Sequence, residues 1–196
     1  MKKLIPRLIS LIFLTVSSQA VTITVNNSAP ADYNDIQSAI NAAVAGDTII
    51  VSNGTYTGPL NRKLNFKGKA VTLQSENGAE SCIIDCENQT YAFNCSTGEG
   101  NDTVIDGFTI SNGNKNQGGA IYCGNQSSPT IINCIIQNNN GSYGGGVYCT
   151  NSSSPVITNC TIRNNSANSY GGGIFCTYSS SPIITNCTFL DNYAGT

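Results

Sequence analysis

The second half of the chain repeats one phrase three times. The copies are GGAIYCGNQSSPTIINCIIQNN (residues 118–139), GGGVYCTNSSSPVITNCTIRNN (144–165) and GGGIFCTYSSSPIITNCTFLDN (171–192). Their prolines, Pro129, Pro155 and Pro182, are 26 and 27 residues apart. A repeat of this period indicates a solenoid, in which each unit packs only against its neighbours.

The composition of each unit indicates the kind of solenoid. Short runs rich in β-branched residues alternate with Gly-Gly, Ser-Ser-Pro and Asn-Asn turns, and neither a leucine ladder nor helical periodicity is present. The pattern predicts an all-β, right-handed parallel β-helix with three short strands per coil. Each strand should pair with its equivalent one coil later, about 4.8 Å away. Degenerate copies at residues 106–112 (DGFTISN) and 82–86 (CIIDC) extend the repeat upstream.

Aligned positions predict ladders of like side chains. Three apolar columns should face inward: Ile131, Ile157 and Ile184; Ile136, Ile162 and Phe189; Ile121, Val147 and Ile174. An asparagine column should follow at Asn133, Asn159 and Asn186, extending back to Asp106 and Asp85. Asn and Asp tolerate left-handed backbone geometry, and stacked amides can hydrogen-bond along a column. We therefore interpret Asp85 and Asp106 as turn residues rather than a catalytic carboxylate pair.

The nine cysteines also follow the repeat. Six of them form two columns: Cys123, Cys149 and Cys176; Cys134, Cys160 and Cys187. Small apolar thiols suit stacked interior positions, and Phe108 takes the place of Cys134 in the degenerate coil. In-register side chains run parallel, which makes the disulfide dihedral awkward.

A core role for these two columns is thus favoured over disulfides. It is also favoured over a metal site, because no CxxC spacing occurs. Cys82, Cys86 and Cys95 are interpreted as lying outside the columns, and they remain the better disulfide candidates. No cofactor is expected.

The N-terminus reads as a secretory signal peptide over residues 1–20. Lys2, Lys3 and Arg7 precede an apolar run from Leu8 to Val16, and Ser18 and Ala20 provide small residues for cleavage. The mature domain would then cover residues 21–196, secreted or on the surface of the cell envelope. Within it, DIQSAINAAV (35–44) has helical spacing, while residues 47–56 and 70–78 each read as a strand and turn.

The charge balance argues against a nucleic-acid partner. Without the predicted signal peptide, six Lys and Arg stand against eleven Asp and Glu, which gives 6 − 11 = −5. Phosphate binding needs a basic face. The one basic group comprises Arg62, Lys63, Lys67 and Lys69, which we interpret as solvated loop charges. No later segment is apolar enough to cross a membrane.

These motifs resemble those of the right-handed parallel β-helix (pectate-lyase-like) superfamily. The resemblance covers residues 21–196 and rests on DIQSAINAAVAGDTIIVSNGTY, VIDGFTI and the SSP-x-I-x-NC units, which look like secreted bacterial β-helix proteins. GGAI (118–121) and FLDN (189–192) are also similar to the GGA[ILV] and FxxN motifs of chlamydial polymorphic outer-membrane proteins. The resemblance implies that the N-terminal helix caps the core. It implies little about function, since this scaffold hosts lyases, hydrolases, esterases and adhesins.

The residues for such catalysis are not apparent. A lyase needs a Lys or Arg base beside calcium-binding carboxylates, and the chain contains no histidine for a hydrolase that uses one. The outward positions of the first strand in each clear coil hold Ala120 and Tyr122, Gly146 and Tyr148, and Gly173 and Phe175. The sequence therefore favours a non-catalytic binding or adhesion module. The alternative is the N-terminal part of a polysaccharide lyase or glycoside hydrolase.

Tyr122, Tyr148 and Phe175 form the candidate binding site. Stacked aromatics on a flat sheet can hold sugar rings or a partner protein, with a polysaccharide as the candidate ligand. Two other interpretations stay open: a loop or another domain covers the column, or the chain is a structural stalk without a site. Because the sequence ends just after FLDN without a capping segment, we expect further coils or another domain to cover that end.

Overall fold

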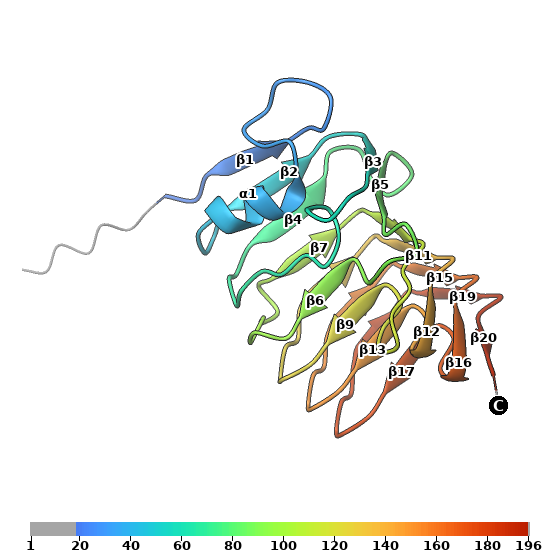
Figure 1. The fold of residues 1–196 in the computed structure, drawn as a ribbon. Coiled ribbons are helices and arrows are strands. Elements are labelled where there is room, and N and C mark those ends of the chain that lie inside the picture. Colours follow the sequence, from blue (N-terminus) through green and yellow to red (C-terminus); the bar gives the residue numbers. More distant parts are fainter. Residues whose placement is uncertain (1–18, 196) are drawn as a thin grey trace, which may run out of the picture.

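The computed structural model describes residues 19–195 of the 196-residue chain. In Figure 1 the chain winds coil after coil around one elongated core, from the N-terminal helix to the last strand. Each strand pairs in parallel with its equivalents in the neighbouring coils, which confirms the predicted β-helix. The predicted signal peptide falls mainly on residues 1–18, which lie outside the described residues. No helix in the described part is long and apolar enough to cross a bilayer.

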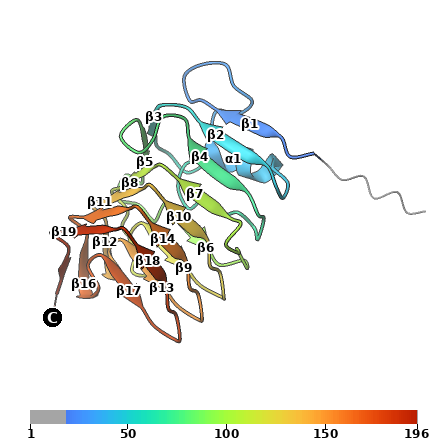
Figure 2. The ribbon, with the colours of Figure 1, turned by 180° about the vertical axis from the view of Figure 1, so that it is seen from behind.

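Four parallel sheets run along the solenoid. Sheet A, seen from behind in Figure 2, contains β1 (Thr22–Val25), β2 (Thr48–Val51), β4 (Thr72–Ser75), β7 (Val104–Asp106), β10 (Thr130–Ile132), β14 (Val156–Thr158) and β18 (Ile183–Thr185). Sheet B contains β3 (Gly54–Tyr56), β5 (Cys82–Asp85), β8 (Thr109–Ser111), β11 (Ile135–Gln137), β15 (Thr161–Arg163) and β19 (Thr188–Leu190).

The other two sheets are shorter. Sheet C contains β6 (Phe93–Cys95), β9 (Ile121–Cys123), β13 (Val147–Cys149) and β17 (Ile174–Cys176). Sheet D contains β12 (Asn140–Tyr143), β16 (Ser166–Tyr170) and β20 (Tyr193–Ala194). Sheet D adds a strand to the last three coils that the sequence did not predict, because these segments contain no β-branched residues.

The three predicted apolar columns are confirmed. Ile131 pairs with Ile157, Ile136 with Ile162, and Ile121 with Val147, and all six side chains are buried. Because each column repeats at the strand spacing, every coil covers the apolar face of the one before it. At the last coil the inward Ile184 and Phe189 are 42% and 48% exposed.

Helix α1 (Ile36–Ala42) lies against β1 and β2 at the first coil. Its N-cap, Asp35, accepts a hydrogen bond from the backbone N–H of Ser38 at 2.8 Å. Ile36, Ala39 and Ile40 are its buried face, so the helix covers the apolar interior where the first coil would otherwise meet water.

The basic group is only partly solvated. Lys63 and Lys67 are exposed, as expected, and Arg62 forms an ion pair with Glu87. Lys69 differs, because its ammonium donates to the carbonyls of Ile40 and Ala43 at 2.6 and 2.7 Å. The interpretation of Lys69 as a solvated loop charge is therefore wrong: the side chain satisfies carbonyls that the end of α1 leaves unpaired.

The predicted asparagine column is correct for its three asparagines and wrong for its two aspartates. Asn133, Asn159 and Asn186 all have φ between 52° and 54°. Asp106, however, lies opposite Ile132 in sheet A, and Gly107 (φ 75°) takes the column position. This column position requires left-handed backbone geometry, which glycine adopts as readily as asparagine. Because the sequence alignment looked for a polar residue, it assigned Asp106 to the column instead of the next residue, Gly107.

Asp85 lies in a different sheet. It is the last residue of β5 and pairs with Ser111 of sheet B. Asp106 still contacts the asparagine column, since the Asn133 amide donates to its carboxylate at 2.8 Å. The two carboxylates therefore occupy different places in the coil, although the sequence alignment placed them together.

Candidate functional site

The predicted aromatic column exists, but it is longer than predicted and partly covered. Tyr122, Tyr148 and Phe175 are register partners in sheet C, and Tyr91 continues the row beyond Tyr122. Neighbouring ring centroids are 5.8–6.2 Å apart, with ring planes within 26° of parallel. The rings therefore form one continuous aromatic strip across the coils.

Tyr148 is not an exposed contact residue. It is only 5% exposed, because Tyr122 and Phe175 flank it and Tyr143 of sheet D packs across it. Tyr148 thus lies on the outward face of sheet C, as predicted, but its ring is covered and cannot be a direct ligand contact. A neighbouring segment covers the centre of the column, which was one of the interpretations left open.

Sheet D supplies the aromatic residues that the sequence prediction missed. Tyr143 and Tyr170 stack on each other at 6.0 Å, and they stack on Phe175 at 5.8 and 5.6 Å. They are 37% and 60% exposed. The sequence could have indicated this second aromatic row, because both tyrosines directly precede the Gly-Gly-Gly of a repeat and are 27 residues apart. Gln117 is their equivalent in the first clear repeat and pairs with Tyr143.

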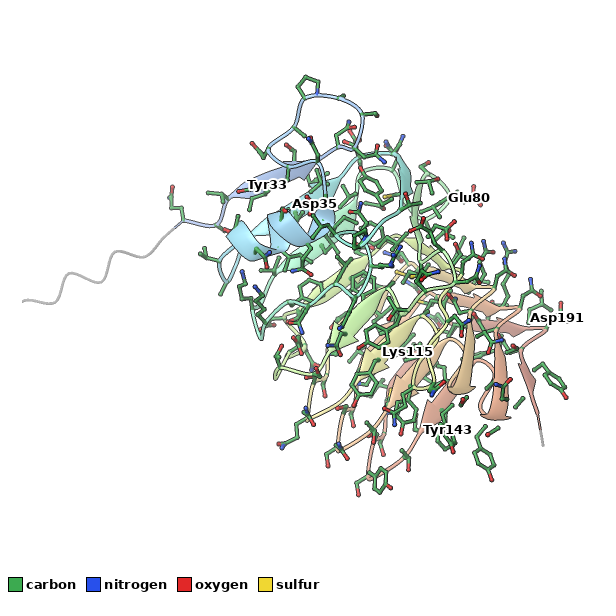
Figure 3. The ribbon with its side chains drawn as sticks, viewed as in Figure 1. Tyr33, Asp35, Glu80, Lys115, Tyr143 and Asp191 are labelled. Atoms are coloured by element: carbon green, nitrogen blue, oxygen red, sulfur yellow. The ribbon has the colours of Figure 1, made fainter. Side chains whose placement is uncertain are left out.

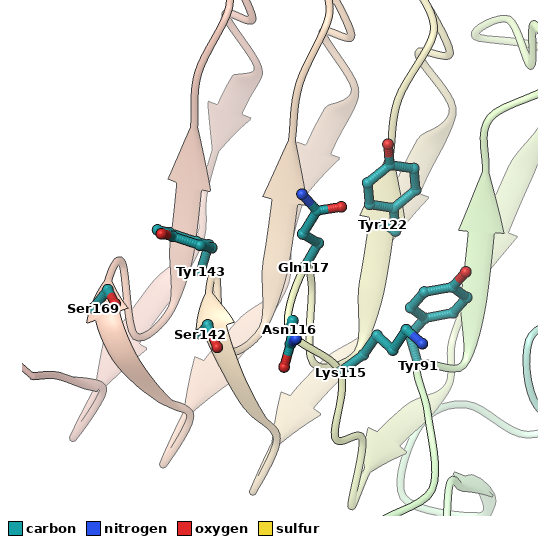
Figure 4. A pocket seen from close by; sticks show the side chains of 8 residues that line it. All are labelled: Tyr91, Lys115, Asn116, Gln117, Tyr122, Ser142, Tyr143 and Ser169. Carbon is teal, nitrogen blue, oxygen red and sulfur yellow. The ribbon is translucent and has the colours of Figure 1, made fainter.

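Sheets C and D border a groove of about 700 Å³, seen from close by in Figure 4. Figure 3 shows where two of its lining residues, Lys115 and Tyr143, lie on the molecule. Its lining consists of Tyr91, Lys115, Asn116, Gln117, Tyr122, Ser142, Tyr143 and Ser169. A second hollow of about 320 Å³ continues it, sharing Gln117 and Tyr143 and adding Tyr148, Tyr170, Phe175, Thr177 and Tyr178. We call the two together the aromatic groove.

A polar row follows the aromatic rows. Asn116, Ser142 and Ser169 line the groove at successive coils, and the backbone N–H of Ser142 donates to the Asn116 carbonyl at 3.0 Å. Figure 4 shows Lys115 reaching toward Tyr91 at one end of this row. Hydroxyl and amide groups therefore recur beside the rings at about the strand spacing of 4.8 Å.

The glycine after β9 lies close to the Tyr122 ring. A Cβ on Gly124 would lie 2.5 Å from the Tyr122 hydroxyl, so a larger residue there would require the ring to move. In Figure 4 the Tyr122 ring stands toward the groove with its hydroxyl pointing away from Lys115.

The groove carries little charge. Lys115 is the one charged side chain among its lining residues. Burial raises the pKa of the Tyr91 and Tyr122 phenols, and each neighbouring phenol raises it further. These hydroxyls therefore stay protonated at neutral pH and can donate hydrogen bonds to a ligand.

One of the two thiol columns lies in sheet C, directly behind the aromatic strip. Cys123, Cys149 and Cys176 pair in register, and Cys95 pairs with Cys123 at the start of the column. The prediction that Cys95 lies outside the columns is therefore wrong. It failed because the coil that contains Cys95 lacks the Gly-Gly and Ser-Ser-Pro markers used for the alignment.

The second thiol column shows a reason for cysteine at that place. Cys134 and Cys160 donate to the carbonyls of Ile132 and Thr158, two residues earlier, at 3.2 and 3.3 Å. Cys187 does the same with Thr185 at 3.3 Å. A weak S–H donor thus reaches the carbonyl just before the left-handed asparagine while its sulfur stays in the core.

No thiol is joined to another in this structure. All nine cysteines are free, including Cys82 and Cys86, which are buried. The alignment also missed Cys82: the next residue, Ile83, pairs with Thr109, so Cys82 shares the column of Phe108. Within the described residues, no group of three or more Cys, Asp or Glu side chains is placed to hold a metal ion.

Comparison with known proteins agrees with this architecture. The family model described as "Right handed beta helix region" matches residues 12–196, and the chain belongs to this family. No curated protein and no solved structure matches the chain. The narrower resemblance to pectate-lyase-like proteins and to the chlamydial motifs stays a prediction.

Proposed function

We propose that this chain is a secreted or cell-surface binding module that holds a polysaccharide in the aromatic groove. The observation that carries the proposal is the pairing of two aromatic rows with a row of hydroxyl and amide groups on one face. Sugars present both apolar C–H faces and hydroxyl groups. Aromatic rings suit the faces, while Ser, Asn, Gln and Tyr side chains suit the hydroxyls.

The groove direction favours an extended ligand. The aromatic and polar rows cross several coils instead of converging on one point, so a chain lying along the solenoid meets similar groups at each coil. Tyr148 would then act as a support that holds Tyr122 and Phe175 in place. The exposed contacts would come from Tyr122, Tyr143 and Tyr170.

Glycan-array screening, followed by calorimetric titration of the best oligosaccharide, tests the proposal. Tyr143→Ala should raise the Kd about 5- to 10-fold, because an aromatic contact contributes about 1–1.4 kcal/mol. Tyr193→Ala is the matched control, since Tyr193 is 67% exposed and does not line the groove. Equal effects of the two variants, or no binding by any glycan, would overturn the proposal.

The same samples address the catalytic alternative. Product analysis after long incubation with each bound polysaccharide should show unchanged chain length. Release of unsaturated uronides or of shorter oligosaccharides would support the lyase or hydrolase hypothesis instead. A thermal melt of Tyr143→Ala must match that of the unmodified chain before its affinity is interpreted.

A further inference from the structure

The outward face of sheet A is a regular array of short side chains. Its seven strands pair in parallel without a register shift, so the outward residues of successive strands stand directly beside one another. The first outward column consists of Thr22, Thr48, Thr72, Val104, Thr130, Val156 and Ile183. The second consists of Thr24, Ile50, Gln74, Asp106, Ile132, Thr158 and Thr185. Every member of the first column is β-branched, and in the second only Gln74 and Asp106 are not.

The array repeats in two directions. Neighbouring strands lie about 4.8 Å apart, and the two outward residues of one strand lie about 6.6 Å apart, because alternate residues share a face. Figure 2 shows the strands stacked one after another from β1 to β18. The hydroxyl and methyl groups of this face therefore form a two-dimensional lattice that runs the whole length of the solenoid.

The lattice is held rigidly from behind. The inward residues between the two columns, such as Ile105, Ile131 and Ile157, are fully buried. A β-branched side chain has few rotamers, and the Thr130 hydroxyl is fixed further because it donates to the Asn101 carbonyl at 2.8 Å. Little conformational freedom is left to lose on binding, so even weak contacts with a partner can add up.

The composition of the face restricts the partner. Among these outward residues Asp106 is the only charged one and none is aromatic. A charged polymer would find no complementary charges there, and sugar rings would find no aromatic faces. The strands cover only roughly 300 Å², well below the about 800 Å² that each partner usually buries in a stable protein interface. A periodic partner that needs neither charge nor aromatic contacts fits this face best.

We propose that the outward face of sheet A binds the surface of ice. The threonine hydroxyls exchange hydrogen bonds with water molecules of the crystal, while the methyl groups between them are removed from liquid water. Each contact is weak, but a crystal repeats as the strands do, so many contacts form together. A bound chain hinders growth of the crystal at that place. The inference is independent of the proposed glycan binding, because the aromatic groove lies on sheets C and D.

Sheet B provides an internal comparison. In the three clear repeats the outward positions of sheet A hold only β-branched residues, whereas those of sheet B include Gln137, Arg163 and Leu190. Thr158 of sheet A and Thr161 of sheet B belong to the same coil, and both are half-buried. A longer side chain at Thr158 interrupts the uniform array, while the same change at Thr161 falls on a face that is already irregular.

Thermal hysteresis, the gap between the melting and freezing points of a seed ice crystal, tests the proposal. In nanolitre osmometry the purified chain should open a gap that grows with its concentration, and slowly growing ice should take up the folded chain from solution. Thr158→Lys should lose most of the gap and of the uptake. Thr161→Lys is the matched control and should keep both. Circular dichroism near 0 °C, the temperature at which ice melts, confirms that both variants are folded.

The unmodified chain can overturn the proposal by itself, if it opens no gap and is excluded from growing ice. Equal losses in two folded lysine variants would also contradict it, because the effect would then not belong to sheet A. Light scattering and a pull-down on crystalline cellulose examine the other occupants. A dimer, or binding to cellulose, that Thr158→Lys abolishes and Thr161→Lys keeps would assign the face to that partner instead of ice.

Discussion

The side-chain amide of Asn139 donates to the side-chain oxygen of Asn165 at 2.9 Å inside the solenoid. Asn165 repeats the contact with Asn192 at 3.0 Å. Each asparagine also donates to a backbone carbonyl of the preceding coil, that of Ile110 for Asn139 and that of Ile136 for Asn165. Asn192 is the last residue of FLDN, so in this chain that asparagine is a structural link between coils.

Breaking this ladder should destabilise the fold. Asn165→Ala removes the acceptor for two N–H groups of Asn139 and the donor to the Ile136 carbonyl, all of them buried. Unsatisfied buried groups cost about 1–3 kcal/mol each, so we expect a loss of about 2–4 kcal/mol in the free energy of unfolding. Urea denaturation measures it. The exposed Asn168→Ala should change it by less than about 0.5 kcal/mol, and similar losses in both variants would contradict the ladder's role.

Tyr148 should behave as a core residue. Because its ring is 5% exposed and stacks on both neighbours, Tyr148→Ala should lower the free energy of unfolding by about 3–5 kcal/mol. Tyr148→Phe keeps the ring and should cost less than about 1.5 kcal/mol. Thermal and urea melts distinguish the two. A Tyr148→Ala variant as stable as the unmodified chain would show that the ring is a surface contact after all.

Glu99 should make the fold sensitive to acid. Burial raises the pKa of this carboxyl, but hydrogen bonds from Thr97 and Ser127 outweigh it and bring the pKa below its ordinary value. A carboxyl whose pKa is lower in the folded than in the unfolded state stabilises the fold at pH values above its unfolded-state pKa of about 4.3. This stabilisation is lost as the pH falls toward the folded-state pKa.

Urea midpoints measured between pH 6 and pH 3 test this dependence. Glu99→Gln should reduce the fall in stability below pH 4.5 by the contribution of one carboxylate. Asp32 and Asp47, whose pKa values are also lowered, should still cause the remaining fall. Identical pH profiles for the variant and the unmodified chain would contradict the assignment.

Lys69 should anchor the helical cap. Lys69→Met keeps most of the aliphatic stem but removes the donor to the carbonyls at the end of α1, which should cost about 1–3 kcal/mol. Hydrogen exchange should increase first in residues 36–43. The exposed Lys67→Met is the matched control, and faster exchange in both variants would argue against a specific cap.

Repetition made the fold predictable. Three aligned copies show which positions repeat, so the parallel register and the inward columns of Ile131 and Ile136 followed from periodicity alone. The helical spacing of residues 35–44 predicted α1, and the family resemblance implied that it caps the core. The predicted register was wrong in the upstream coils, where the sequence repeat is degenerate. Around Asp106 and Cys95 a single copy offers no comparison, and glycine and asparagine serve equally well at a left-handed position.

The binding groove was only half predictable. Tyr122, Tyr148 and Phe175 share a column in the sequence, and the structure places them side by side. That Tyr143 packs across Tyr148 depends on the path of sheet D, whose strands contain no β-branched run that would have predicted them.

The sequence by itself thus determined the solenoid, its period and which residues stack in columns, because each column needs only one residue repeated at a fixed spacing. The tertiary structure decided which stacked residues reach solvent. Exposure depends on how segments from different parts of a coil pack against one another, and spacing within the repeat does not encode that packing.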